Sequence, residues 1–218
     1  MEIQGSVSEP YKIIATGSKG NSVLIFGSIL VDVGVPFKMI KDIVYDLKLI
    51  TWSHCHGDHF NPATIKKIIS MRPTIRVAVC QHEAQRAISC GAKNIDILEH
   101  GSWYDYGEFQ VATFKTYHDA PSNGYRFKNE DYKIFFATDT AHLDGISAKN
   151  YTHYLCESNY NEETVYDIIN DIEAKGGFAH QRGSINSHLS EQQARDFVYK
   201  NGNENSIIVP LHESQSKL

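Results

Sequence analysis

The chain alternates short apolar runs, bounded by glycine, proline or polar residues, with longer segments whose apolar residues recur at helical spacing. Short or alternating apolar runs are typical of strands, and a period of about 3.6 residues is typical of an amphipathic helix. The pattern predicts strands at 11–15, 23–26, 29–33, 48–52, 75–79, 95–98, 103–106, 109–117, 133–137, 151–156 and 206–211. It predicts helices at 36–47, 62–70, 83–89, 162–174 and 191–199. Strands and helices alternate, with some adjacent strand pairs, which favours sheets covered by layers of helices.

The turn between the strand at 48–52 and the helix at 62–70 is rich in metal-binding side chains. It reads Ser53-His54-Cys55-His56-Gly57-Asp58-His59-Phe60, and Asn61-Pro62 then suit a helix cap and the first helical position. In an extended segment His54 and His56 point to the same side. We expect Gly57 to turn the backbone, so that Asp58 and His59 reach a neighbouring point. Imidazole and carboxylate suit zinc and similar metals. Two ligands aimed one way and two another predict a pair of metals. The alternative is a solvated histidine-rich loop, but such a loop needs no such spacing.

Length and composition are those of an ordinary globular protein. The 218 residues predict a single domain, 1–218, with 41% hydrophobic and 22% charged residues. No apolar run approaches the ~20 residues that span a bilayer, and the N-terminus lacks the features of a signal peptide. The four cysteines have no disulfide-type spacing, and Cys55 should point away from the histidines beside it. We therefore expect a cytoplasmic protein with no membrane association.

The charge balance bears on the kind of partner. The formal net charge is −5 and there is no run rich in lysine or arginine. Proteins that hold long nucleic acids normally carry a basic stripe, because phosphate contacts supply most of the affinity. The balance favours a small ligand or a short nucleic-acid end and leaves room for a local basic patch. Arg126 and Arg182 are candidates for a substrate phosphate, with surface ion pairs as the alternative.

Two features near the N-terminus allow more than one interpretation. The segment 16–22 contains two glycines but lacks the spacing of a phosphate loop, so we interpret it as a tight turn near the site. Asp32 ends a predicted strand. It could support a metal-binding histidine, or it could be an ordinary aspartate of a strand-end turn.

Four ligand-capable residues follow predicted strands later in the chain. They are His118, Asp139, Glu157 and His212. A sheet scaffold builds a site from such strand ends. Each residue alone is a weak signal, but all four come after the histidine-rich turn and share the same kind of position.

The run His54-Cys55-His56-Gly57-Asp58-His59 matches the His-x-His-x-Asp-His signature, and the chain thereby resembles the metallo-β-lactamase superfamily. The resemblance implies a four-layer αββα sandwich. It implies two zinc ions per chain, with manganese as an alternative. The first metal would bind His54, His56 and His118; the second would bind Asp58, His59 and His212, with Asp139 bridging the two.

A narrower resemblance, to the branch with the YycJ-type exonucleases and ribonuclease Z, extends from Tyr11 to His212. It is carried by Gly17–Ser22, His118–Pro121 with Gly124–Arg126, Ala137–Thr140, Glu157–Asn159 and Ser187–Ser190. It implies that His188 works with Glu157 on the leaving group, so that the catalytic residues are Asp58, Glu157 and His188. Without the resemblance, His188 is an exposed histidine before a helix that Ser190 could cap.

The resemblance implies a dinuclear-zinc phosphodiesterase. Three substrates compete: a small cyclic nucleotide, as for the viral anti-Pycsar proteins; a DNA 5′ end, as for the YycJ-type 5′-3′ exonucleases; and an RNA such as a tRNA precursor. Ribonuclease Z holds tRNA with a long arm, for which this chain has little room, and the acidic balance favours the cyclic nucleotide. A viral origin would place the protein in the host cytoplasm.

A lactonase or thioesterase on the same fold and a non-catalytic binding module are the rival hypotheses. The pair Glu157 and His188 argues against the first, and the full ligand set argues against the second. We also expect a homodimer, because relatives in this branch commonly form one and the helices of residues 62–90 could pack against a partner.

Overall fold

The computed structural model describes residues 9–179 and 181–212, and its strands form two six-stranded sheets. The first sheet follows chain order: β1 (Tyr11–Ala15), β2 (Ser22–Ile25), β3 (Ile29–Val31), β4 (Leu49–Thr51), β5 (Arg76–Val79) and β6 (Asn94–Ile97). The second contains β7 (Trp103–Asp105), β8 (Gln110–Lys115), β9 (Asn123–Lys128), β10 (Lys133–Ala137), β11 (His153–Glu157) and β12 (Ile207–Leu211), in the order β12-β11-β10-β9-β8-β7.

Each sheet has an antiparallel part and a parallel part. In the first sheet, β1, β2 and β3 pair antiparallel, and β3 to β6 pair parallel. In the second sheet, β7 to β10 pair antiparallel, and β10, β11 and β12 pair parallel. Parallel strands end on the same edge of a sheet. Side chains that follow β3 and β4, or β10, β11 and β12, are therefore brought together.

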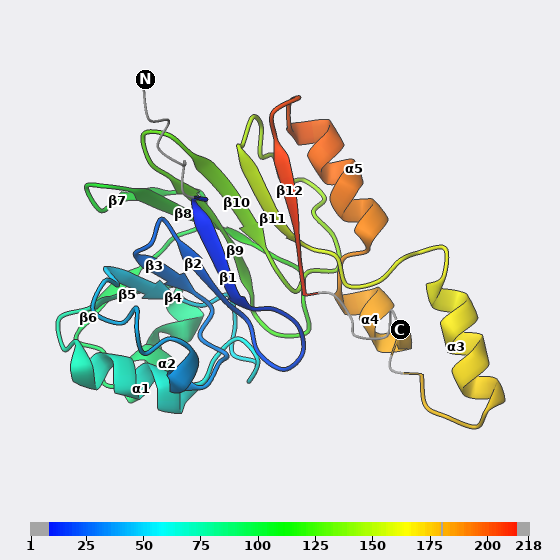
Figure 1. Ribbon diagram of the computed structural model, residues 1–218, viewed down its shortest axis with the longest axis horizontal. Coiled ribbons are helices and arrows are strands. Elements are labelled where there is room, and N and C mark those ends of the chain that lie inside the picture. Colours follow the sequence, from blue (N-terminus) through cyan, green and yellow to red (C-terminus); the bar gives the residue numbers. More distant parts are fainter. Residues whose placement is uncertain (1–8, 180, 213–218) are drawn as a thin grey trace, which may run out of the picture.

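The two sheets pack face to face with helices on their outer faces (Figure 1). Inward-facing residues such as Val31, Leu49, Phe136 and Leu155 form the core between the sheets. α1 (Pro62–Met71) and α2 (Ala84–Ser89) cover the first sheet, and α5 (Glu191–Asn201) covers the second. The predicted αββα sandwich is confirmed.

A pair of helices lies beside the sandwich instead of on a sheet (Figure 1). These are α3 (Val165–Ala174) and α4 (Gln181–Ser187), in the connection between β11 and α5. A small cluster of their own, built on Val165, Ile169 and Ala179, packs them together. We call residues 161–187 the helical excursion.

Three elements differ from the prediction. Residues 36–47 form the 3-10 helix η1 (Phe37–Met39) and turns instead of an α-helix, although Ile40, Val44 and Leu47 are buried as expected. β-branched residues lower helix propensity, and burial in turns satisfies the same apolar spacing. β9 and α4 were not predicted. β9 includes Gly124, and α4 is short and polar, so neither has a strong periodic signal.

Two of the predicted helix starts, those of α1 and α5, are confirmed with their caps. The Asn61 side chain accepts a hydrogen bond from the Thr64 N–H at the start of α1, with Pro62 in the first turn. Ser190 and Gln193 form a reciprocal capping box at the start of α5. A second 3-10 helix, η2 (Gln81–Glu83), precedes α2. Among the described helices, none has the length and apolar character needed to cross a bilayer.

Candidate metal centre

The histidine-rich turn after β4 is held by backbone contacts to two other loops. The Asn21 N–H donates to the Asp58 carbonyl at 2.6 Å, and the Val33 N–H donates to the His59 carbonyl at 2.8 Å. Gly34 lies so close that a Cβ there would be 1.7 Å from the Asp58 carbonyl oxygen. The segment 16–22 is thus a tight turn against the site, as predicted.

Gly57 does not have the role that the sequence suggested. Its φ lies outside the left-handed region, and a Cβ at Gly57 would meet nothing within 4 Å. The turn therefore needs no glycine at this position for its backbone conformation. The position that requires glycine is Gly34, which lies outside the turn and packs closely against its backbone.

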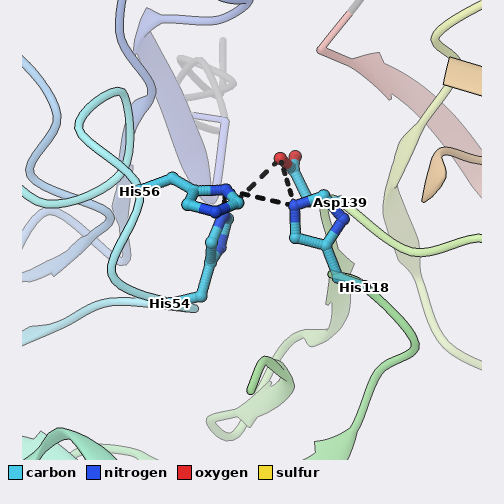
Figure 2. A group of neighbouring side chains, drawn as sticks. All are labelled: His54, His56, His118 and Asp139. Carbon is cyan, nitrogen blue, oxygen red and sulfur yellow. Dashed lines mark hydrogen bonds and ion pairs between the residues drawn. The ribbon is translucent and has the colours of Figure 1, made fainter. Parts of the chain in front are cut away.

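Three imidazoles and one carboxylate converge in a first cluster (Figure 2). His56 Nδ1 lies 3.0 Å from His54 Nε2 and 3.2 Å from His118 Nε2. Asp139 Oδ2 lies 3.7 Å from the Nε2 atoms of both His54 and His118. His54 and His56 follow β4 of the first sheet, whereas His118 follows β8 and Asp139 follows β10 of the second. The cluster therefore contains residues from both sheets.

A second cluster shares Asp139 and contains Asp58, His59 and His212. His59 Nε2 lies 3.3 Å from Asp139 Oδ1 and 3.5 Å from Asp58 Oδ2. His212 Nε2 lies 3.3 Å from Asp58 Oδ2 and 3.7 Å from Asp139 Oδ1. The structure therefore groups all seven predicted ligands in the two sets that the resemblance implied.

Asp139 lies between the clusters with one oxygen toward each. Its Oδ1 is buried and, although it lies at ion-pair distance from His59 and His212, it makes no hydrogen bond with the described residues. A buried carboxylate oxygen needs a partner, and leaving one unmade is costly. A cation among Asp139, His59 and His212 would be such a partner, and the nitrogen and oxygen donors suit zinc. The residues present fit a divalent metal.

Asp32 supports the site, which decides between the two interpretations of this residue. Its Oδ2 accepts a hydrogen bond from His59 Nδ1 at 2.8 Å, and its Oδ1 accepts from the Ser53 N–H at 2.7 Å and the Ser53 hydroxyl at 2.9 Å. Asp32 and His59 are both buried. A carboxylate on the outer nitrogen fixes the ring orientation and leaves Nε2 for the metal.

Backbone conformation also marks the site. Five non-glycine residues among the described ones have positive φ, and three of them are Asp32 (φ 55°), Asp139 (φ 42°) and His212 (φ 52°). Each follows the end of a strand. Residues in this conformation cost energy and cluster at functional sites, where they redirect a side chain.

Glu157 and His188 form a pair against the second cluster. His188 Nδ1 donates to Glu157 Oε1 at 2.5 Å, and the His188 ring stacks on His212 with centroids 5.3 Å apart. Glu157 is fully buried, and its Oε2 accepts from the Thr140 N–H at 2.9 Å and the Leu189 N–H at 3.1 Å. The residues alone had suggested an exposed histidine at 188, and only the resemblance indicated this pair.

Burial and charge set the protonation of the site. Burial and the positive charge of His59 together lower the pKa of His54 to about 2, although the charge of Asp139 opposes the shift. Burial also opposes the charged form of His212, but hydrogen bonds to Asp58 and Glu157 outweigh it and raise its pKa to about 10. Because only neutral imidazole binds a metal, a cation here would displace the His212 proton and take over its role of balancing the carboxylates.

The acid–base pair behaves differently. Burial lowers the pKa of His188, but the hydrogen bond and charge of Glu157 raise it more, so the net shift is upward. The pair therefore favours the imidazolium, which is the form that can donate a proton. For Asp139, burial raises the pKa, yet the charges of His59 and His212 hold it well below its usual range.

Two residues of the site had no role in the sequence interpretation. The Asn21 amide nitrogen lies 2.9 Å from His59 Nε2 and 3.3 Å from Asp58 Oδ2. Asp119 Oδ1 lies 3.0 Å from His118 Nε2 and 3.5 Å from His56 Nε2. The sequence offered one signal for each: Asn21 lies in the turn 16–22, and Asp119 directly follows His118.

The two arginine candidates point elsewhere. Arg126 Nη2 donates to the Ser147 carbonyl at 3.0 Å, and Arg182 pairs with Glu173 at 2.6 Å and 2.8 Å. The alternative, a surface ion pair, therefore holds for Arg182. Arg126 instead contacts a backbone carbonyl and lies over the Phe114 ring, so neither interpretation holds for it. Cys55 is a free, partly buried thiol and belongs to none of the clusters found among the described residues.

Comparison with known proteins agrees with this architecture. A family model described as Beta-lactamase superfamily domain matches residues 26–153, which is more than half of the chain. The protein therefore belongs to the β-lactamase superfamily and has the metallo-β-lactamase fold. No curated protein sequence matches the chain.

Three solved structures illustrate the fold. The metallo-β-lactamase fold protein YhfI from Bacillus subtilis is 13% identical, with a TM-score of 0.71, and the match covers 94% of this chain and 86% of YhfI. The short form of human tRNase Z is 14% identical, with a TM-score of 0.66 and coverage of 94% and 93%. Zinc-bound PqqB from Methylobacterium extorquens is 9% identical, with a TM-score of 0.65 and coverage of 94% and 89%.

Proposed function

We propose that the protein is a dinuclear-zinc phosphodiesterase. The observation that carries this proposal is the Glu157–His188 pair beside two ligand clusters that share Asp139. A phosphodiester releases an alkoxide, a poor leaving group that needs a proton, and a histidine steadied by a carboxylate provides it. One structural neighbour is a tRNase by name, and another contains zinc.

Each residue has a defined task in this proposal. His54, His56 and His118 hold one cation, Asp58, His59 and His212 hold the other, and Asp139 serves both. When bound, the two cations supply Lewis-acid stabilisation of the attacking and leaving oxygens. Manganese is the alternative to zinc.

The proton transfers fall to residues of the chain. His188 Nδ1 is hydrogen-bonded to Glu157, so Nε2 is the nitrogen that can donate a proton to the leaving oxygen. Glu157 stabilises the imidazolium, and its fixed hydrogen bonds keep the ring in place. The partly exposed carboxylate of Asp58 accepts the proton of the attacking water.

The helical excursion favours a small substrate. It contains five acidic residues and only two lysines or arginines, Lys175 and Arg182. Lys175 pairs with Asp171 and Arg182 with Glu173. An acidic projection repels a nucleic-acid backbone, whose binding depends on basic contacts. We therefore rank a small cyclic nucleotide first, a DNA 5′ end second and a tRNA precursor third. A counter-defence role goes with the first.

A turnover panel tests the proposal. Zinc-reconstituted protein is assayed on 2′,3′- and 3′,5′-cyclic nucleotides, single-stranded DNA with defined ends, a tRNA precursor and a lactone, with Asp139→Ala as the metal-deficient control. We expect phosphodiester hydrolysis, fastest on a cyclic nucleotide. Turnover of the lactone alone would show a carbon-ester hydrolase.

We also propose a homodimer. The outer layer of α1 and α2, within residues 62–90, is the surface proposed to pack against a second copy, and Ile88 on α2 is 54% exposed there. Light scattering at micromolar concentration should give twice the chain mass, and a monomer mass would contradict the dimer.

A further inference from the structure

A pocket of about 840 Å³ opens beside the first cluster. It lies between the loop after β8, residues 116–122, and α4. His118 and Ser187 line it and are joined by a hydrogen bond from His118 Nδ1 to the Ser187 carbonyl at 3.1 Å. Pockets for small ligands have volumes of roughly 300–1,000 Å³. The pocket therefore adjoins the metal centre and has the volume to take the organic part of a substrate.

One wall of the pocket is an aromatic platform. Tyr117 is 40% exposed, and its ring stacks on His142 with centroids 4.1 Å apart and planes 23° apart. The Tyr117 backbone is fixed on both sides, because its N–H donates to Thr140 Oγ1 at 3.0 Å and its carbonyl accepts from the Ala141 N–H at 2.7 Å. Pro121 and Ala141 add apolar surface. The Lys115 ammonium also lies over the ring, 5.6 Å from its centroid, and a second planar group would stack in its place.

The two charged residues that line the pocket, Asp119 and Lys115, have opposite charges, so the lining selects no net charge on the occupant. Asp119 lines it on the side of the metal centre, with Oδ1 3.0 Å from His118 Nε2. This carboxylate repels a second phosphate at that position. Lys115 also lines the pocket. On α4, Asn186 donates its amide to the Arg182 carbonyl, and the described residues give its Oδ1 no partner, so that oxygen can accept from an amino group.

We propose that this pocket binds the nucleobase of the substrate, with Tyr117 as its stacking platform. This inference rests on the proposed phosphodiesterase function, and it adds that the substrate is a nucleotide recognised by its base. Stacking of a base on an aromatic side chain is worth about 1–3 kcal/mol, which is roughly a 5- to 150-fold change in affinity.

Calorimetry on the zinc-loaded protein tests the proposal without requiring turnover. AMP and ribose 5-phosphate differ by the base, and the ratio of their dissociation constants reports the base alone. We expect AMP to bind roughly 5- to 150-fold more tightly to the wild type and to Tyr117→Phe. In Tyr117→Ala the ratio should fall toward one. Tyr199→Ala, at a tyrosine on α5 that is 90% exposed, is the matched control and should keep the wild-type ratio.

The outcomes separate the two proposals. If Tyr117→Ala lost metal through its neighbour His118, AMP and ribose 5-phosphate would both bind more weakly, and the ratio of their dissociation constants would not change for that reason. An unchanged ratio in Tyr117→Ala, or a wild type that binds both ligands equally, overturns the nucleobase pocket. Hydrolysis of methyl p-nitrophenyl phosphate, which has no base, is measured in parallel. If the wild type does not hydrolyse this compound, the result contradicts the proposed phosphodiesterase function. The ratio of dissociation constants still decides whether the pocket binds the base.

Discussion

The two halves of the molecule contribute to the candidate metal centre in different ways. The first half supplies four of the proposed ligands, His54, His56, Asp58 and His59, from one turn after β4. The second half supplies His118, Asp139 and His212 one at a time, after β8, β10 and β12. A contiguous turn brings its ligands together by local geometry. The dispersed ligands meet only because the strands pair in one register.

The backbone carries the same difference. Among the ligands of the turn none has a positive φ, whereas Asp139 and His212 both do. The turn is held by hydrogen bonds from Asn21 and Val33 and by the close approach of Gly34. The second half instead holds two of its three proposed ligands, Asp139 and His212, in strained conformations at strand ends. The first half should therefore be sensitive to packing changes, and the second to loss of single side chains.

The largest effect is expected from Asp139→Ala. Asp139 faces both clusters, whereas His56 belongs to the first alone. After zinc reconstitution the wild type should hold about two zinc ions per chain. Asp139→Ala should hold fewer than one and lose activity, and His56→Ala should keep about one. Metal analysis by mass spectrometry decides this, and two zinc ions in Asp139→Ala would exclude the bridging role.

His188→Ala should leave zinc content unchanged, because this residue is outside the proposed ligand set. Loss of a general acid should lower kcat by roughly 10²–10⁴-fold on a phosphodiester with an alkoxide leaving group. The defect should shrink for p-nitrophenolate, which leaves without a proton. Steady-state rates on both substrates and the metal content measure this. An undiminished rate on the alkoxide substrate would refute the acid role, and zinc loss would indicate a metal ligand.

Gly34→Ala tests the packing of the turn. The new Cβ would lie 1.7 Å from the Asp58 carbonyl oxygen and 2.7 Å from the His59 nitrogen, so the turn must move. A shift of about 1 Å in a site costs roughly 10²-fold in rate, and we expect that loss in kcat/KM. Gly57→Ala in the same turn is the control, since its Cβ meets nothing within 4 Å. Equal activity of the two variants would show that the turn does not depend on this contact.

Asp32→Asn should have the smallest effect of the four. Asparagine tolerates the positive φ at this position, so the backbone is kept while the charge beside His59 is lost. Loss of such a partner weakens metal binding by roughly 10–100-fold. Competition with a chelator for zinc gives the affinity. A wild-type affinity would mean that Asp32 positions the turn through Ser53 and does not tune His59.

Much of the fold was visible in the sequence because it depends on local pattern. Apolar runs indicated eleven of the twelve strands, and the caps Asn61 and Ser190 indicated where α1 and α5 begin. The missing strand, β9, contains a glycine that is required by tertiary packing: a Cβ at Gly124 would lie 2.1 Å from the Phe114 ring. At 36–47 the helical spacing reflected which residues are buried and not the backbone conformation.

The sequence by itself determined the chemical nature of the site, since imidazole and carboxylate spacing within one turn is a local property. Tertiary structure decided which distant residues join it. His188 reaches the centre because Glu157, 31 residues earlier, accepts its hydrogen bond and also fixes Leu189. Asp32 supports His59 because β3 and β4 are parallel neighbours and end on the same edge. Such contacts depend on strand order and register, which no local pattern of hydrophobic and polar residues specifies.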